Sequence, residues 1–455
     1  MIKLPEMEQT PPDFQNDHNV YILGAGFSSE AGYPLVHNFM DKMREAALTK
    51  QGLERRELEA VLRFRKEASA AAYRTTFDPE NIEDLFSLAA ATENLSTRSD
   101  LTIAIAETLI YCKNSVFDRI ERFESSFLND SESIEGFERN NVTGQNRYPL
   151  IDRYKLYTGI MAGKWGGTPL ELNSFITFNY DMVLEEAFQM WNLPFKYEGL
   201  IKPATDTLRA LGLGYDLNYH ELPNLFVTDP NQDKAISVIK LHGSINWGVD
   251  ISTPKGQLKG FHIYASYTED LANDIRSNPE SLMQYKELVL TPPVWEKGTT
   301  PGQSSNPLSR AWSQAIKTLQ TATRVIIIGY SLPHTDAHFR YLMAAGLKDN
   351  ISLNKIVFIN QGLKEGHPSK PILEERIFGV FRKELKEKGV LELLGLDARE
   401  FFTNKSYNGL DHEALLNRKF PTRIFASNGM ADIRFGARSS LAEIHEDSPT
   451  TGPAL

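Results

Sequence analysis

Short apolar runs alternate along this chain with longer stretches in which apolar and polar residues follow a helical period. The apolar runs have the length and composition of buried parallel strands. They are Val20–Leu23, Ser174–Thr177, Ala235–Leu241, Glu287–Leu290, Arg324–Ile328 and Lys355–Ile359. Amphipathic stretches such as Met182–Met190 and Ala311–Leu319 lie between them. The alternation predicts a doubly wound, mainly parallel, Rossmann-like α/β sheet, with Lys355–Ile359 as its last strand.

Between the first two apolar runs the pattern is mainly helical. One helix is expected from Ser28 to about Lys50, and others over 51–72, from Asn81 onward and over Leu101–Phe127. Charged amphipathic residues over 371–395 predict further helix. We therefore expect these parts: a flexible N-terminal arm 1–18, an α/β domain 19–362 with a helical insertion at about 51–170, a C-terminal helical extension 363–424 and a disordered tail 425–455.

The composition argues against several classes of protein. The 455 residues carry a formal net charge of −10, which does not suit general nucleic-acid binding. Cys112 is the single cysteine, so neither an intrachain disulfide nor a cysteine-based zinc site can form. The N-terminus lacks a signal-peptide pattern, and no apolar run approaches the roughly 20 residues of a membrane span. We expect a cytoplasmic protein with no membrane and no direct nucleic-acid partner.

The first strand runs into a glycine-rich turn, Gly24-Ala25-Gly26, just before a helix expected to begin at Ser28. Glycines let the backbone approach a phosphate closely, and the free N–H groups of a helix start attract anions. The spacing of Gly24, Gly26 and Gly32 differs from the dinucleotide fingerprint GxGxxG. By itself the turn is therefore compatible with an anion site or with a close packing contact alone.

Small or polar residues follow the main apolar runs: Gly24-Ala25-Gly26, Asn179 with Asp181, His242-Gly243, Gly329 with Ser331, and Asn360. If the strands are parallel, these residues meet at one edge of the sheet, where open α/β sheets bind ligands. Turn formation explains the glycines well. It explains less well a histidine directly after AISVIKL or an asparagine directly after ITF, so Asn179 and His242 together indicate a functional site.

The segments GAGFSSEAG, TFNYD, KLHGSINW, IIIGYSLP and FIN resemble, in that order, the motifs of the sirtuin family of NAD-consuming enzymes. The resemblance is greatest to the bacterial sirtuin-like domains of antiphage defence, which hydrolyse NAD+. It runs from residue 19 to about 360 without the helical insertion, and it implies a sirtuin-like NAD-binding catalytic domain over 19–362.

The resemblance implies a role for each residue at the strand ends. The pyrophosphate and nearby ribose would be held by Gly24, Ala25, Gly26 and Ser28. The adenosine part would be contacted by Gly329, Ser331 and Asn360. Asn179 would lie beside the nicotinamide ribose and help to position water, with Asp181 supporting its loop. His242 would be the base that acts on a ribose hydroxyl or on the attacking water.

The residue types agree with that chemistry. Cleavage of the nicotinamide–ribose bond passes through an oxocarbenium-like state, as glycoside hydrolysis does. Nicotinamide leaves as a neutral group, so the reaction needs an oriented ribose, an oriented water and a base with a pKa near neutrality. Histidine supplies such a base, and an asparagine amide adds hydrogen bonds without charge. Neither a metal ion nor a covalent nucleophile is required.

Features that serve deacylation in sirtuins are missing from this sequence. Residues 244–328 hold no cysteine for a zinc ribbon, and Pro34-Leu35-Val36-His37 replaces the PDFR-like sequence. Thr291-Pro292-Pro293-Val294-Trp295 stands in place of the FGE-like strand of the peptide cleft. Water is left as the acceptor. The sequence thus predicts an NAD+ glycohydrolase that releases nicotinamide and ADP-ribose, with NAD+ as its substrate and no zinc.

Two alternatives stay open: a protein deacylase or ADP-ribosyltransferase, and a non-catalytic module that senses NAD+ or ADP-ribose. The resemblance further implies the toxic effector of an abortive-infection system, silent until an activating partner senses phage. A homo-oligomer is expected, with the helical insertion and residues 365–420 as candidate surfaces. Candidate partners are a ring-forming ATPase and a short Argonaute-type protein.

Overall fold

A parallel sheet forms the centre of the computed structural model. Residues 18–91, 100–115, 149–162, 170–191, 193–199, 216–220, 235–252, 257–264, 284–291, 308–333 and 337–403 are described. The strands of the central sheet are β1 (Asn19–Leu23), β2 (Asn173–Thr177), β3 (Phe195–Tyr197), β5 (Ile236–Lys240), β9 (Arg324–Ile328), β10 (Lys355–Ile359) and β11 (Leu391–Leu394). Their order is β11-β10-β9-β1-β2-β5-β3, and every neighbouring pair is parallel. The predicted doubly wound sheet is confirmed.

Helices cover both faces of this sheet. They are α6 (Pro149–Met161), α7 (Val183–Met190), α10 (Ser309–Gln320), α11 (Ala337–Leu347), α12 (Lys370–Val380) and α14 (Ala398–Thr403). Tyr21 and Leu23 of β1 belong to the hydrophobic core that includes residues of α6, α7 and α14. Val20 and Ile22 belong to the other core, with α10, α11 and α12. Because both faces of each central strand are buried, its apolar run is continuous.

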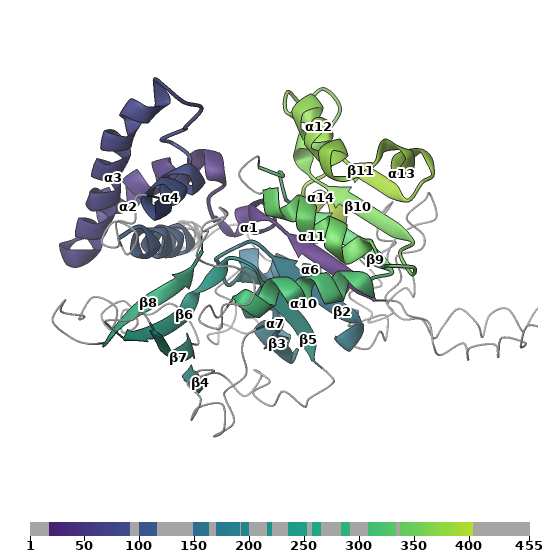
Figure 1. The fold of residues 1–455 in the computed structure, drawn as a ribbon, viewed down its shortest axis with the longest axis horizontal. Helices are drawn as coiled ribbons and strands as arrows, with labels where there is room; N and C mark the ends of the chain where they lie inside the picture. The colour runs from purple at the N-terminus through teal and green to yellow at the C-terminus, as the bar shows by residue number, and fades with distance from the viewer. Residues whose placement is uncertain are drawn as a thin grey trace, which may run out of the picture.

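The described chain between β1 and β2 is helical, as expected of the insertion. It contains α1 (Ala25–Ser28), η1 (Ser29–Ala31), η2 (Val36–Asn38), α2 (Phe39–Thr49), α3 (Gly52–Ala72), α4 (Ile82–Ala91), a helix over 100–115, and α6. Figure 1 shows α2, α3 and α4 grouped at one end of the molecule. The expected single helix from Ser28 to Lys50 is wrong. Gly32 closes η1 with a left-handed φ of 88°, and a new helical segment begins only after Pro34.

Three further expectations about strands and helices need correction. The strand expected at Glu287–Leu290 is part of β8 (Gln284–Leu290), which lies in a second sheet with β4 (Asp216–His220), β6 (Gly243–Ser252) and β7 (Gln257–Tyr264). Lys355–Ile359 is not the last strand, because β11 pairs with it in parallel. Residues 371–395 are not wholly helical, since α12 and α13 (Lys383–Glu387) are followed by β11.

Some expectations lie wholly or partly outside the described residues. These are the end of the C-terminal extension from 404 to 424, the tail 425–455, the helix beyond residue 115 and almost all of the arm 1–18. The proposed domain boundaries therefore stay predictions. Of the helices that the structure describes, none has the length and apolar character to cross a membrane.

Candidate functional site

The polar residues at the strand ends meet at one edge of the central sheet. Leu23 pairs with Thr177 on one side and with Ile328 on the other, and Thr177 and Ile328 pair in turn with Lys240 and Ile359. The carboxyl ends of five neighbouring parallel strands are therefore level. The chain places β2 and β5 on one side of β1, and β9 and β10 on the other. Open α/β sheets bind ligands at such a reversal of strand order, and the predicted convergence is confirmed.

Glycines allow the loops after β1 and β9 to touch. The Gly24 amide donates to Ile328 O over 3.0 Å and the Gly26 amide to Gly329 O over 2.8 Å. A Cβ on Gly24 would lie 2.6 Å from the Tyr330 Cα. The packing interpretation of these glycines therefore holds, whatever else they do.

This packing limits how the turn can hold a phosphate. The Gly24 and Gly26 amides already donate to β9 and its loop, and the Phe27 amide donates to Gly24 O. The Ala25 amide donates to no other described residue, so it is the donor that this turn offers to a ligand. Phosphate contacts by Gly24, Ala25 and Gly26 stay predictions.

Two hydrogen bonds donated by its carboxamide nitrogen fix the side chain of Asn179. Its Nδ2 donates to Gly24 O at 2.9 Å and to Ser28 Oγ at 3.1 Å, and its backbone amide donates to Thr177 Oγ1 at 3.1 Å. Within the described chain no group donates to Asn179 Oδ1. Because both amide protons are used, the atom left for a ligand is a hydrogen-bond acceptor.

Asp181 supports the same loop from a buried position. Its Oδ1 accepts the Val183 amide over 3.0 Å at the start of α7, and the nearby Ser28 side chain helps to lower the pKa of its carboxyl. Burial raises the pKa of the Asp181 carboxyl, while the positive charge of Lys240 works against that rise. Asp181 thus ties its own loop to the start of α7, and its expected support of Asn179 stays a prediction.

His242 lies at the end of β5 among aromatic rings. The ring centroids of Phe178, Tyr180 and Trp312 are 5.2, 6.2 and 6.4 Å from its own. Burial, and secondly the charge of His338, lowers the pKa of His242 from 6.5 to about 3. The imidazole is therefore uncharged at neutral pH, and the expected pKa near neutrality is wrong. Among described residues none hydrogen-bonds to its ring nitrogens.

Of the residues expected to contact adenosine, Asn360 is held by hydrogen bonds to the protein, whereas Ser331 is exposed to solvent. Asn360 donates from Nδ2 to Tyr330 O over 2.9 Å and accepts the Gly362 amide at Oδ1 over 2.8 Å, so it holds the loop after β9. Ser331 is exposed, and its carbonyl accepts a hydrogen bond from Arg376. Adenosine contacts by Gly329, Ser331 and Asn360 stay predictions. Nowhere in the described ranges do three or more His, Cys, Asp or Glu side chains form a group that could hold a metal ion.

Three residues that the sequence analysis did not single out support this cluster. Tyr154 of α6 donates to Phe27 O over 2.5 Å and accepts the Ala31 amide over 3.2 Å, so the insertion holds the loop after β1. Lys240 and Glu185 form a buried ion pair behind Asp181. A lysine inside the apolar run AISVIKL was a usable signal for that pair, whereas nothing in the sequence marks Tyr154.

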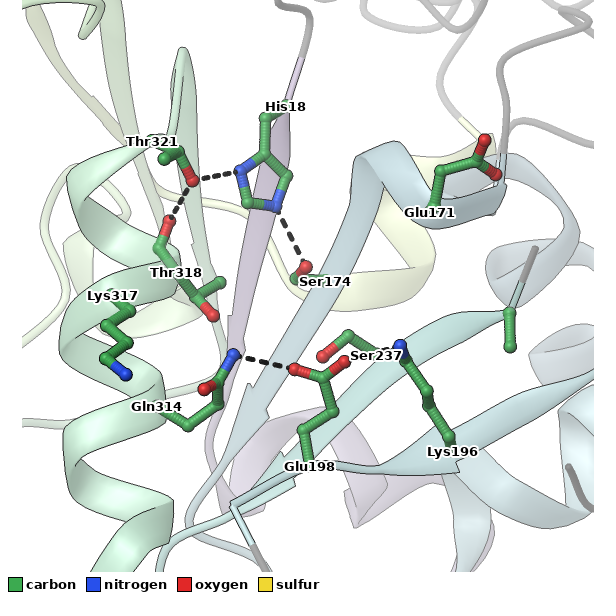
Figure 2. A pocket seen from close by; sticks show the side chains of 11 residues that line it. His18, Glu171, Ser174, Lys196, Glu198, Ser237, Gln314, Lys317, Thr318 and Thr321 are labelled. Carbon is green, nitrogen blue, oxygen red and sulfur yellow. Dashed lines mark hydrogen bonds and ion pairs between the residues drawn. The ribbon is translucent and has the colours of Figure 1, made fainter. Parts of the chain in front are cut away.

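A cavity of about 210 Å³ lies at the opposite edge of the sheet (Figure 2). His18, which precedes β1, bridges Thr321 and Ser174 with two contacts of 2.9 Å, and Lys196 pairs with Glu198 over 2.8 Å. These residues lie near the amino ends of β1, β2 and β3. The cavity is therefore separate from the cluster at the carboxyl ends.

Comparisons with known proteins show a similarity between part of this chain and a known family. The family model of the SIR2-like domain matches residues 173–376, which include Asn179 and His242 but not β1. Sir2Tm bound to a propionylated peptide is 12% identical, with a TM-score of 0.29 over 82% of this chain and 93% of that one. A Sir2 homologue in complex with NAD is 13% identical, with a TM-score of 0.32 over 81% and 90%. No curated protein matches the chain.

Proposed function

Because the chain contains a SIR2-like domain, we propose that it binds NAD+ and hydrolyses the bond between nicotinamide and ribose. NAD+ and water would give nicotinamide, ADP-ribose and a proton. One observation carries the proposal. At the carboxyl edge of the sheet, Asn179 Oδ1 and the ring nitrogens of His242 are acceptors or donors that no described residue uses.

In this proposal the bond to nicotinamide breaks first, and positive charge develops on the ribose. Asn179 Oδ1 accepts a hydrogen bond from a ribose hydroxyl or from the attacking water. His242, being uncharged, accepts a second one. Its lowered pKa makes His242 a weaker base than free histidine, so its contribution is chiefly orientation. An oxocarbenium-like state captures water readily, which makes a strong base unnecessary.

The geometry also bears on the alternatives. A module that only senses NAD+ gains little from a carboxamide whose two protons are bound by the protein, so that only its oxygen is left for a ligand. Deacylation or ADP-ribosyl transfer needs a second substrate beside the ribose. The residues that replace the peptide-cleft sequence begin at Thr291, and 292–307 lie outside the described residues. We therefore retain water as the proposed acceptor.

The fate of the ADP-ribosyl group distinguishes these functions. The full chain is incubated with NAD+ labelled in its adenylate part, with an acyl-lysine peptide present, and the products are separated by chromatography. Free labelled ADP-ribose with equimolar nicotinamide is the expected result. Label in acyl-ADP-ribose would indicate a deacylase, label on protein a transferase, and intact NAD+ with measurable binding a sensor.

We further propose that this activity serves antiphage defence by depleting cellular NAD+. The support for this step is the resemblance to defence-type sirtuin-like domains. The same resemblance supports two further proposals, a homo-oligomer and an activating partner. The test is induced expression in a bacterial host, with and without phage challenge, followed by measurement of cellular NAD+. We expect NAD+ to fall with the wild-type chain and to be maintained with Asn179→Ala at equal protein level.

A further inference from the structure

A buried ion pair lies directly behind the Asn179–Asp181 loop. Lys240 Nζ is 2.9 Å from Glu185 Oε1, and the two side chains are only 1% and 2% exposed. The same ammonium donates to the backbone carbonyl of Asp181 over 2.5 Å. Tyr197 Oη donates to Glu185 Oε1 over 2.9 Å. The pair thus connects β3, β5 and α7 to the loop that carries Asn179.

Such a pair is an inefficient way to stabilise a fold. Removing two charges from water costs free energy that their attraction repays only in good geometry, and apolar residues of similar size often do as well. Lys240 is the last residue of β5, two positions before His242, and Glu185 is in the first turn of α7 after Asp181. The position of the ion pair beside the Asn179–Asp181 loop indicates that the pair supports this loop rather than the hydrophobic core.

We propose that Lys240 and Glu185 are positioning residues, which hold the Asn179–Asp181 loop and keep the Asp181 carboxylate charged. A charged Asp181 would attract the hydroxyl hydrogen of the nearby Ser28, which leaves a lone pair of Ser28 Oγ for the hydrogen bond from Asn179 Nδ2. A protonated Asp181 is a poorer acceptor and frees that hydroxyl to turn. As far as it concerns activity, this inference rests on the proposed NAD+ hydrolysis.

The other groups around Asp181 are consistent with this assignment. Lys240 from β5 lowers the pKa of Asp181, and Glu185 from α7 raises it. Tyr33 and Tyr154 also lie within electrostatic range, and burial holds the pKa of both phenols above its usual value, so they are uncharged. Lys240 is therefore the cation that offsets the burial of Asp181.

The two members of the pair should shift the pH dependence of activity in opposite directions. Activity falls as Asp181 takes up a proton at acid pH. Lys240→Met removes the charge that lowers the pKa of Asp181, so the acid limb of kcat/KM moves up by about one pH unit. Glu185→Gln removes the charge that raises this pKa, so the acid limb moves down. Lys196→Met, at the partly buried pair with Glu198, is the matched control and leaves the limb unchanged.

Opposite displacements of the two limbs support the proposal. The proposal is overturned if both variants lose activity while the acid limb of kcat/KM stays at the pH of the wild type, because the loss of a purely structural pair has that effect. If the wild type does not turn over NAD+, the proposed function fails, and thermal unfolding then tests the inference separately. The Tm deficit of Lys240→Met should shrink on acidification, as its uncompensated carboxylates take up protons, whereas that of Glu185→Gln should not. Deficits independent of pH in both variants would contradict the assignment.

Discussion

Asn179 Nδ2 lies 3.1 Å from Ser28 Oγ and donates a hydrogen bond to it, although 151 positions separate the two residues in the sequence. The bond joins the loop after β2 to the first helix after β1. Together with the bond to Gly24 O, it uses both protons of the carboxamide. The orientation of the Asn179 carboxamide is thus set by residues of the loop and helix that follow β1, and no described residue donates to its oxygen.

Replacing Asn179 should abolish most NAD+ turnover without unfolding the protein. Asn179→Ala removes the outward acceptor, and loss of one oriented polar group at a reacting centre typically costs about 10²–10³-fold in rate. Asn179→Asp retains an acceptor oxygen but loses the donors to Gly24 O and Ser28 Oγ, so it should not restore the rate. Initial rates of nicotinamide release test both variants. Wild-type rates in Asn179→Ala would remove this residue from the site.

Ser28→Ala should destabilise the protein more than the same change at the adjacent Ser29. Ser28 is 1% exposed, accepts a hydrogen bond from Asn179 and lowers the pKa of the buried Asp181 carboxyl, so its loss should cost about 1.5–3 kcal/mol. Ser29 donates to the neutral carbonyl of Gly26 and should cost about 0.5–1.5 kcal/mol. Urea unfolding of the two variants provides the comparison, and equal costs would argue against the Ser28 network.

Gly329→Ala should be among the most damaging single changes at the strand ends. Gly329 has a φ of +66°, and a Cβ there would lie 2.3 Å from the Phe27 amide nitrogen. Gly366 is the matched control, because its φ is +78° but a Cβ would meet nothing within 4 Å. We expect about 1–2 kcal/mol for Gly366→Ala and about 2–5 kcal/mol for Gly329→Ala, since overpacking adds to the backbone cost. Thermal or urea unfolding measures the difference, which vanishes if the two loops do not touch.

The burial of His242 predicts a particular dependence of stability on pH. Its pKa is about 3 in the folded chain and 6.5 without burial, so the unfolded chain binds the extra proton between these values. The stabilising effect of neutral His242 is therefore complete above pH 6.5 and is lost as the pH falls toward 3. His242→Gln should lose less stability than the wild type between about pH 7.5 and about pH 5. Parallel pH profiles of Tm for the two proteins would contradict the burial of this imidazole.

The sequence predicts the central sheet well because each central strand is buried on both faces. Val20–Leu23 and Arg324–Ile328 are continuous apolar runs for that reason, and polar residues beside parallel strand ends necessarily converge. β11 was missed because its four residues include a glutamate and follow two helices, so their pattern does not differ from that of an amphipathic helix. The break after Gly32 was missed because only its backbone conformation interrupts the helical pattern.

The sequence predicts which residues belong to the candidate site, but not which contacts they make. Asn179, Asp181 and His242 stand out at strand ends in the sequence. The carboxamide nitrogen of Asn179 donates to Gly24 and Ser28, which lie 155 and 151 positions away, and no pattern along the chain encodes such pairs. The lowered pKa of His242 likewise depends on rings from α10 and on His338 of α11, which only the folded chain brings together.

The most direct measurement is the rate at which purified full-length protein converts NAD+ to nicotinamide and free ADP-ribose, alone and with its candidate activating partner. The Asn179→Ala variant is assayed in parallel at the same concentration, once its Tm has been shown to equal that of the wild type. We predict equimolar release of both products by the wild type and at least about a hundredfold less by the variant. Intact NAD+ with the wild type in the activated assembly, or equal release by the variant, would contradict an NAD+ hydrolase centred on Asn179.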